Sequence, residues 1–506
     1  MSQLLDPSTA SGRKARVLLL GGIVAGCLGA LIDGRSLWGM HIVFEGLAFG
    51  CFVALLALEG LRRWLTVPAV LAVSGLLFAL ALSFPPRESA DVWSYAMYGR
   101  IVASGDDPYR TAPAAFPDDP WLHLVSRAWR DTPSLYGPLF NETAAEAVRL
   151  SRGSALRVRV GFQLLAVIGV GGAMLLLARR SVPPAALALV GLNPLVVLGV
   201  VNAGHNDALV GLAVLGAVLL AEDERSALSG VCAGLGALIK VVALLPAGIL
   251  VLWAWRRRSW REALLAGGAI LETVAAGYLI AGSGAVRALG AETGLVTPFS
   301  VWRLTWLGRP DIATQAGRVL HILARGRLGS AIPVALVLVL ALAAALPWLR
   351  LPSPARAVGV SALLYLVAAP YAVPWYVFWA LPVLAAAWRC RLTWLALGYQ
   401  AALTIAYSLA LRRPVGTVAS TARVSYFGAL IGAEALAVLA LLALPLIRAR
   451  RWAGLGARVA ASPDGPVTPT GASWPRPSGT GRTGFEPPPG WPGGRPRRRA
   501  GDGGSR

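Results

Sequence analysis

The chain has 506 residues, of which 56% are hydrophobic and only 14% are charged, and its mean hydropathy is +0.62. A soluble chain normally carries about a quarter charged residues. This composition excludes an ordinary soluble globular protein and indicates a chain that uses lipid as its solvent.

The formal net charge of +22 would suggest a nucleic-acid partner in a soluble protein. Here the arginines gather at the ends of apolar segments, at 62–63, 179–180, 256–258 and 448–451. This is the positive-inside pattern of a membrane protein, so we expect no nucleic-acid partner. The four cysteines lie in or beside apolar segments without CxxC spacing, and they predict neither a disulfide framework nor a metal site.

Apolar segments near the bilayer-spanning length of roughly 20 residues recur from Val17 to Ile447. Arg13–Arg16 before the first of them resembles the start of a signal sequence, but apolar sequence continues past Cys27, so we expect an uncleaved anchor. In chain order the expected spans are 17–33, 41–61, 65–84, 158–178, 183–201, 207–221, the short pair 227–239 and 242–255, 262–281, 327–348, 357–371, 374–388, 392–411 and 426–447. Only helices satisfy every backbone group within one such segment. The sequence therefore predicts an all-α polytopic integral membrane protein with about 12–14 transmembrane helices.

Segment 227–255 is too short for two full spans and too long for one. Lys240 and Pro246 within it favour a pair of half-helices that enter from the inner side. A bilayer permits such a break only where protein or water surrounds it.

The distribution of arginines predicts a multi-pass protein of the plasma membrane with both termini in the cytoplasm. We expect a cytoplasmic N-terminus at 1–16, a transmembrane domain at 17–452, and extracytoplasmic segments at 85–157, 282–326 and 412–425. Residues 453–506 are rich in Pro, Gly and Arg. Such a segment cannot bury enough apolar surface to fold and predicts a disordered cytoplasmic tail.

Asp91 lies near the start of the first outer segment, shortly after the third span. A carboxylate at the mouth of a bundle can be reached by a polar substrate and by a lipid tail, although Ser89 and Asp91 could instead cap a helix. Asp106-Asp107 lies in a turn-forming sequence and could instead hold a divalent metal, but no third carboxylate lies at ligand spacing. We therefore expect no metal and no other cofactor.

Three further groups of polar or aromatic residues are candidates for a site. His205, Asn206 and Asp207 join two spans at the outer face. A turn there does not need three consecutive strongly polar residues, which favours a site. Lys240 is one of only two lysines and could hold a phosphate as a point charge or extend its ammonium toward the interface. The aromatic segment 370–376 fits either a site or an interfacial aromatic belt, and Arg303 could meet phosphate or a loop carboxylate.

Several of these segments occur in one order along the chain: Asp91–Tyr95, Asp106–Tyr109, Tyr136–Pro138, His205–Asp207, Lys240 and Pro374–Tyr376. Together they resemble the polyprenol-phosphomannose-dependent α-1,6-mannosyltransferases of actinobacteria, the MptA/MptB type, over residues 17 to about 450. The resemblance implies a GT-C-like bundle with a large first extracytoplasmic catalytic loop. It also implies an inverting transfer of mannose from a polyprenyl phosphate to a hydroxyl of a lipomannan-type acceptor.

By analogy with GT-C enzymes, the resemblance makes Asp91 the catalytic base. Our hypothesis assigns the donor phosphate and sugar to Lys240, Arg303, His205, Asn206, Asp207 and Tyr376. It assigns the acceptor and its loop to Tyr95, Asp107, Tyr109 and Tyr136. The family pattern has Gly-x-Asn-Pro-Tyr where this chain has Gly105–Tyr109, which argues against a direct catalytic role for Asp107.

The chemistry required at the outer face agrees with these assignments. No nucleotide sugars occur there, so an activated sugar must arrive on a lipid carrier, and its phosphate leaves as a stable anion. The protein must supply a base for the acceptor hydroxyl and positive charge for the phosphate. The expected partners are a polyprenyl-phosphate sugar donor, a glycolipid acceptor and membrane lipid.

Two alternatives remain at this point. A transporter or flippase would explain Glu45, Glu272 and Glu434 within apolar segments, although the polar motifs gather on one face and no internal repeat is visible. A GT-C transferase of another sugar would share every motif above.

Overall fold

The computed structural model describes residues 9–33, 40–62, 64–288, 297, 300, 302, 327–388, 391–411 and 425–443. Internal contacts divide the chain into Met1–Ala449 and Arg450–Arg506, and all described residues belong to the first unit. The expected tail at 453–506 lies outside the described residues, as do most of 282–326 and nearly all of 412–425.

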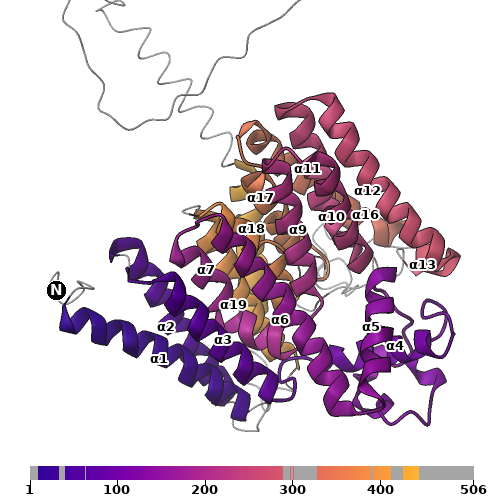
Figure 1. Ribbon diagram of the computed structural model, residues 1–506, viewed down its shortest axis with the longest axis horizontal. Coiled ribbons are helices and arrows are strands. Elements are labelled where there is room, and N and C mark those ends of the chain that lie inside the picture. Colours follow the sequence, from indigo (N-terminus) through magenta and orange to yellow (C-terminus); the bar gives the residue numbers. More distant parts are fainter. Residues whose placement is uncertain are drawn as a thin grey trace, which may run out of the picture. The chain divides into compact units, whose positions relative to one another are not determined.

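Every regular element in the described ranges is helical (Figure 1), which confirms the all-α class. The α-helices of the first half are α1 (Ala10–Asp33), α2 (Met40–Arg62), α3 (Val67–Ser83), α4 (Asp91–Ala103), α5 (Pro138–Ser151), α6 (Ala155–Arg179), α7 (Pro184–Gly191), α8 (Pro194–Val196), α9 (Asp207–Glu222) and α10 (Ser226–Ile239). Those of the second half are α11 (Leu244–Arg257), α12 (Trp260–Ala281), α13 (Ser283–Ala288), α16 (Arg327–Ala345), α17 (Ala355–Ala368), α18 (Leu381–Ala386), α19 (Arg391–Leu411) and the helix Ser425–Ala443. A π-helix, η4 (Val197–Asn202), and short 3₁₀ helices link them; the latter are η1 (Pro113–Ala115), η2 (Leu122–Leu124), η3 (Arg127–Trp129), η5 (Val241–Ala243), η8 (Leu346–Arg350) and η9 (Pro374–Trp379).

Six described helices are long and apolar enough to cross a bilayer: Ala10–Asp33, Met40–Glu59, Ala155–Arg179, Pro184–Asn202, Trp260–Ala281 and Ser425–Ala443. On α12, Leu271, Leu279 and Ile280 are 69%, 81% and 88% exposed. Such a row of exposed apolar side chains is stable in lipid and not in water, which confirms a polytopic membrane protein. The other expected spans correspond to helices that do not meet both the length and the hydropathy expected of a span, so the number of spans stays a prediction.

The segment 227–255 is broken where the sequence predicts a break. Helix α10 ends at Ile239, Lys240 has an extended backbone with φ −151° and ψ 123°, and α11 begins at Leu244 after one turn of 3₁₀ helix. The break places the backbone and side chain of Lys240 at the junction of two short helices.

Asn202, the last residue of the π-helix η4, anchors the start of the first outer segment. Its side-chain amide donates to the carbonyls of Ala81, Phe84 and Pro85 and accepts from the backbone N–H of Arg87 at 2.9 Å. π-Helical turns often occur at functional sites. Here the turn ties the chain just before α4 to the segment that leads into His205.

Candidate active site

A cavity of about 300 Å³ lies where α4, the α10–α11 break, α16 and η9 meet. Asp91, Tyr136 and Lys240 are among the polar side chains in its wall. The rest of the wall is mainly apolar or aromatic: Trp129, Leu135, Val241, Val242, Leu244, Leu245, Val334, Leu338, Tyr365, Pro370, Tyr371, Trp375, Tyr376 and Trp379. The cavity wall therefore carries a carboxylate and an ammonium beside an apolar surface.

Asp91 is the first residue of α4, and its side chain is 23% exposed. Its backbone N–H donates to the hydroxyl of Ser89 at 3.1 Å, and within the described chain its carboxylate accepts no backbone hydrogen bond. The carboxylate is therefore not used as a helix cap. Burial raises the pKa of Asp91 to about 6, while Ser89 and Lys240 act to lower this pKa and Asp207 acts to raise it.

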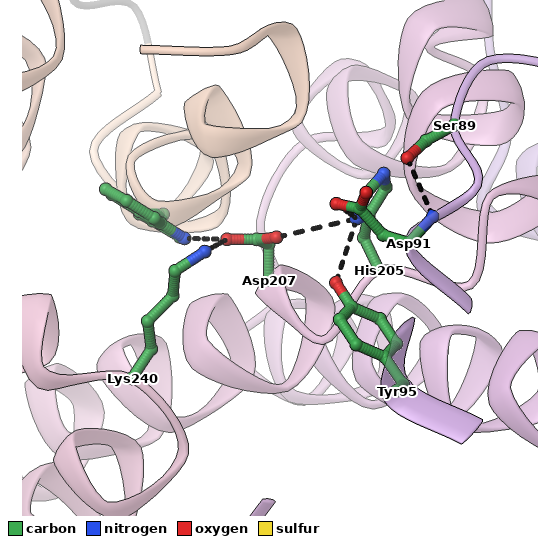
Figure 2. A network of polar contacts seen from close by, with 7 residues as sticks. Ser89, Asp91, Tyr95, His205, Asp207 and Lys240 are labelled. Atoms are coloured by element: carbon green, nitrogen blue, oxygen red, sulfur yellow. Dashed lines mark hydrogen bonds and ion pairs between the residues drawn. The ribbon is translucent and has the colours of Figure 1, made fainter. Parts of the chain in front are cut away.

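Lys240 is held in a cage of one carboxylate and two aromatic rings. Its Nζ donates to Asp207 Oδ1 at 3.1 Å (Figure 2). The same atom lies 4.0 Å from the ring centre of Tyr376 and 5.2 Å from that of Trp379. Burying an unpaired ammonium would be very unfavourable, and the carboxylate and ring faces offset that cost. An ammonium has three donors, and Lys240 also lines the cavity, so it can bind a further anion there.

The two aromatic rings of the cage come from one turn of 3₁₀ helix. Tyr376 and Trp379 are three residues apart in η9, and side chains at this spacing eclipse one another in a 3₁₀ helix. Their rings stack with centroids 4.2 Å apart and an interplanar angle of 24°. Trp379 Nε1 donates to Asp207 Oδ1 at 2.7 Å, so the same turn also fixes the partner of Lys240.

His205 lies between the two carboxylates and is fully buried (Figure 2). Its Nδ1 is 3.2 Å from the hydroxyl of Tyr95, 3.7 Å from Asp91 Oδ2 and 4.0 Å from Asp207 Oδ2. The imidazole stacks on the ring of Trp375 at 4.0 Å. Burial lowers the pKa of His205 well below its usual 6.5, and the charge of Lys240 lowers this pKa further.

The Tyr136-Gly137-Pro138 turn packs directly on the helix break. The N–H of Gly137 donates to the carbonyl of Ile239 at 3.0 Å, and a Cβ at Gly137 would lie 2.1 Å from the carbonyl oxygen of Leu238. Only glycine permits this approach. The turn thereby places Tyr136 beside Lys240 in the cavity wall.

The structure brings together most of the residues that the sequence singled out. Asp91, Tyr136, Lys240 and Tyr376 line the cavity. Tyr95, His205 and Asp207 contact this group from behind the wall and do not line the cavity, and Asn206 is only 2% exposed and also does not line it.

The remaining predicted residues lie elsewhere or cannot be placed. Asp107 accepts from the backbone N–H of Tyr109 at 2.8 Å and pairs with Arg110 at 3.2 Å. These contacts are those of a turn, which the sequence offered as the alternative to a site. Neither Asp107 nor Tyr109 lines the cavity. Arg303 lies outside the described residues.

Two tryptophans belong to the site although the sequence did not single them out. Trp379 binds Asp207, and Trp129 lines the cavity from the 3₁₀ turn η3. Trp379 was detectable, because it follows Tyr376 at the i+3 spacing that a turn beginning at Pro374 would eclipse. Nothing in the local sequence distinguishes Trp129.

Comparison with known proteins finds a matching family. Residues 17–257 match the MptA/MptB family in the region described as Alpha-(1->6)-mannopyranosyltransferase, N-terminal domain. The chain is 31% identical over 369 residues to Alpha-(1->6)-mannopyranosyltransferase A of Mycobacterium tuberculosis, an alignment that covers 66% of this chain and 69% of that relative. The chain belongs to this family. The resemblance expected from the ordered motifs is confirmed.

Other members of the family align over similar or shorter regions. Identity is 30% over 400 residues to Alpha-(1->6)-mannopyranosyltransferase B of Corynebacterium glutamicum, covering 69% of this chain and 63% of that relative. It is 36% over 140 residues to a probable alpha-(1->6)-mannopyranosyltransferase of Mycolicibacterium smegmatis, covering 26% and 25%. A comparison with solved structures finds no match. Membership makes the protein a mannosyltransferase and disfavours the transporter alternative.

Proposed function

We propose that this enzyme transfers mannose from a polyprenyl-phosphate donor to a hydroxyl of a lipoglycan acceptor at the outer face of the membrane. The observation that carries the proposal is the composition of the cavity. Its wall contains one carboxylate, Asp91, and one ammonium, Lys240, next to an apolar surface that includes Val242, Leu245 and Leu338. A donor with a phosphate and a hydrocarbon chain needs the positive charge and the apolar surface, and the acceptor hydroxyl needs the carboxylate as a base.

In the proposed reaction Asp91 removes the proton of the acceptor hydroxyl. The acceptor oxygen then forms a bond to C1 of mannose, and the bond from C1 to the phosphate oxygen breaks with its electron pair remaining on the phosphate. Polyprenyl phosphate leaves as an anion. The configuration at C1 inverts, so a β-linked donor gives an α-linked product. A positioned base typically contributes about 10²–10⁴-fold to such a step.

Lys240 supplies the positive charge for the departing phosphate. Asp207 and Trp379 hold the ammonium at the cavity wall before the donor arrives, so little reorganisation is needed in the transition state. In this assignment His205 and Asp207 act through Asp91 and Lys240 and do not touch the donor, because both are fully buried outside the cavity lining.

The test is mannosyl transfer by the purified protein from polyprenyl phosphomannose to a synthetic mannoside acceptor. We expect transfer by the wild type and a loss of about 10²–10⁴-fold in kcat for Asp91→Asn. Asp106→Asn, a carboxylate change outside the cavity, is the matched control. Transfer from a nucleotide sugar and not from the lipid donor would overturn the donor class, and full activity of Asp91→Asn would overturn the base.

A further inference from the structure

A second depression lies on the same outer segment as the catalytic cavity. It is a groove of about 540 Å³ formed around the C-terminal part of α4 and the turns that follow η1. The charged and aromatic side chains that line it are Arg100, Phe116, Asp118 and Asp119. None of them belongs to the catalytic cavity.

Contacts within the protein hold Arg100 and Asp119 of the groove in place before any ligand binds. Arg100 Nε lies 3.0 Å from Asp119 Oδ2, the backbone N–H of Trp121 donates to Asp119 Oδ1 at 2.8 Å, and the guanidinium of Arg100 stacks 4.2 Å above the ring of Trp121. These contacts fix the planes of the guanidinium and of the Asp119 carboxylate. Asp118 is exposed and has no partner within the described chain, so its carboxylate is available to a ligand.

The groove and the catalytic cavity are joined by one short stretch of chain. The N–H of Ala114 donates to the carbonyl of Arg130 at 2.8 Å, which places the segment entering the groove beside Trp129 in the cavity wall. Along α4, Arg100 lies nine residues after Asp91, which is about 14 Å along the axis and about two and a half turns, so the two side chains leave the helix on opposite faces. A ligand that occupies both sites must therefore be several sugars long, because it has to pass around this helix.

The chemistry of the groove selects a neutral polyhydroxylated ligand. Arg100, Asp118 and Asp119 sum to one negative charge, which disfavours a phosphate or another anion. A planar guanidinium donates and a carboxylate accepts in the bidentate patterns that neighbouring hydroxyl groups can satisfy. The half-buried ring of Phe116 offers an apolar face for the C–H side of a sugar ring.

We propose that this groove is a distal acceptor subsite that binds sugar units of a growing neutral mannan several residues away from the hydroxyl that is mannosylated. The inference rests on the proposed function and deepens it by stating what selects a long acceptor. The enzyme then prefers an acceptor chain that reaches both the cavity and the groove, and a monosaccharide acceptor gains nothing from the groove.

The test compares a mannose monosaccharide acceptor with a linear oligomannoside of six units, using the full-length enzyme and saturating lipid donor. For Asp118→Asn and for Phe116→Ala, we expect the ratio of kcat/KM for the oligomer to kcat/KM for the monosaccharide to fall about tenfold, since one lost hydrogen bond or ring contact has roughly that effect. The fall should appear in KM and not in kcat. Glu142→Gln, an exposed carboxylate on α5 outside both depressions, should leave the ratio unchanged.

An unchanged ratio in both groove variants would overturn the subsite, even though wild-type transfer still supports the proposed function. Asp118→Asn removes no contact within the described chain, so misfolding cannot account for its effect. If the wild type transfers mannose to neither acceptor, the proposed function fails first. Titration of the protein with the oligomannoside alone, followed by tryptophan fluorescence, then decides the groove: binding that Asp118→Asn weakens supports it, and no binding overturns it.

Discussion

Asp91 combines a partly exposed carboxylate with a pKa raised by burial to about 6. A base must be deprotonated, so kcat/KM should be nearly constant above pH 7 and should fall tenfold per pH unit below about pH 6. At pH 5 it should be about a tenth of its plateau. The measurement is kcat/KM for the acceptor between pH 4.5 and 8. A phosphodiester donor does not titrate in this range, so a flat profile would contradict the assignment of Asp91.

The Lys240–Asp207 pair can have a structural role, a catalytic role or both, and a double-mutant cycle separates them. Lys240→Met leaves the buried Asp207 carboxylate without its cation and should lower the free energy of unfolding by about 3–5 kcal/mol. Asp207→Asn in the same chain removes the uncompensated charge, so it should restore most of that stability.

Transfer activity should not return with stability in the double variant, because the cavity still lacks its positive charge. Thermal unfolding in detergent and mannosyl transfer are measured on the same preparations. Recovery of both properties together would show that Lys240 serves the fold alone.

At the residue scale, the residue types of the candidate site could be predicted from the sequence, but the position of each residue relative to the cavity could not. Their order along the chain indicated a site containing Asp91, His205, Asp207 and Lys240, and the structure brings these four together. Which of them face the cavity depends on burial, which spacing along the chain does not encode. His205 in particular is 0% exposed, although its sequence position at the outer face suggested contact with the donor.

At the scale of elements, the contact between the Tyr136–Pro138 turn and the helix break is the most sensitive to a small change. In Gly137→Ala the new Cβ would lie 2.1 Å from the carbonyl oxygen of Leu238. Relieving this overlap moves the turn away from Lys240, so we expect a loss of about 1–3 kcal/mol of stability together with a clear fall in kcat.

The matched control for that variant is Gly161→Ala. Gly161 lies inside α6, and a Cβ added there would have no neighbouring side chain or backbone of another element within 4 Å in the described chain. Alanine there should be neutral or stabilise the helix by up to about 1 kcal/mol. Equal melting temperatures and equal activities for the two variants would contradict the proposed role of the turn.

The helix break was predictable because a lysine and a proline interrupt a segment whose length fits neither one span nor two. The cage around Lys240 was not. The i+3 spacing brings Tyr376 and Trp379 together on η9, but the cage also needs Asp207, which lies 172 residues before Trp379 in the chain. The local sequence of η9 does not encode this long-range contact.

At the scale of the whole molecule, composition and charge predicted the class of fold, because the bilayer restricts a chain to very few solutions. The side of the membrane that the cavity faces is a separate prediction, and it depends on the clustering of arginines near 179–182 and 256–261. Helix α5 belongs to the segment expected outside, and the turn after α6 is expected inside.

Cysteine labelling tests this orientation in a chain whose four native cysteines are replaced by alanine. Leu150→Cys on α5, where the side chain is 77% exposed, should react with a membrane-impermeant maleimide in intact cells. Ser181→Cys, in the turn after α6, should react only after the membrane is permeabilised. The reverse result would place the cavity on the side where nucleotide sugars are available. An activated lipid carrier would then be unnecessary, and the proposed donor would have to be abandoned even if mannosyl transfer itself were observed.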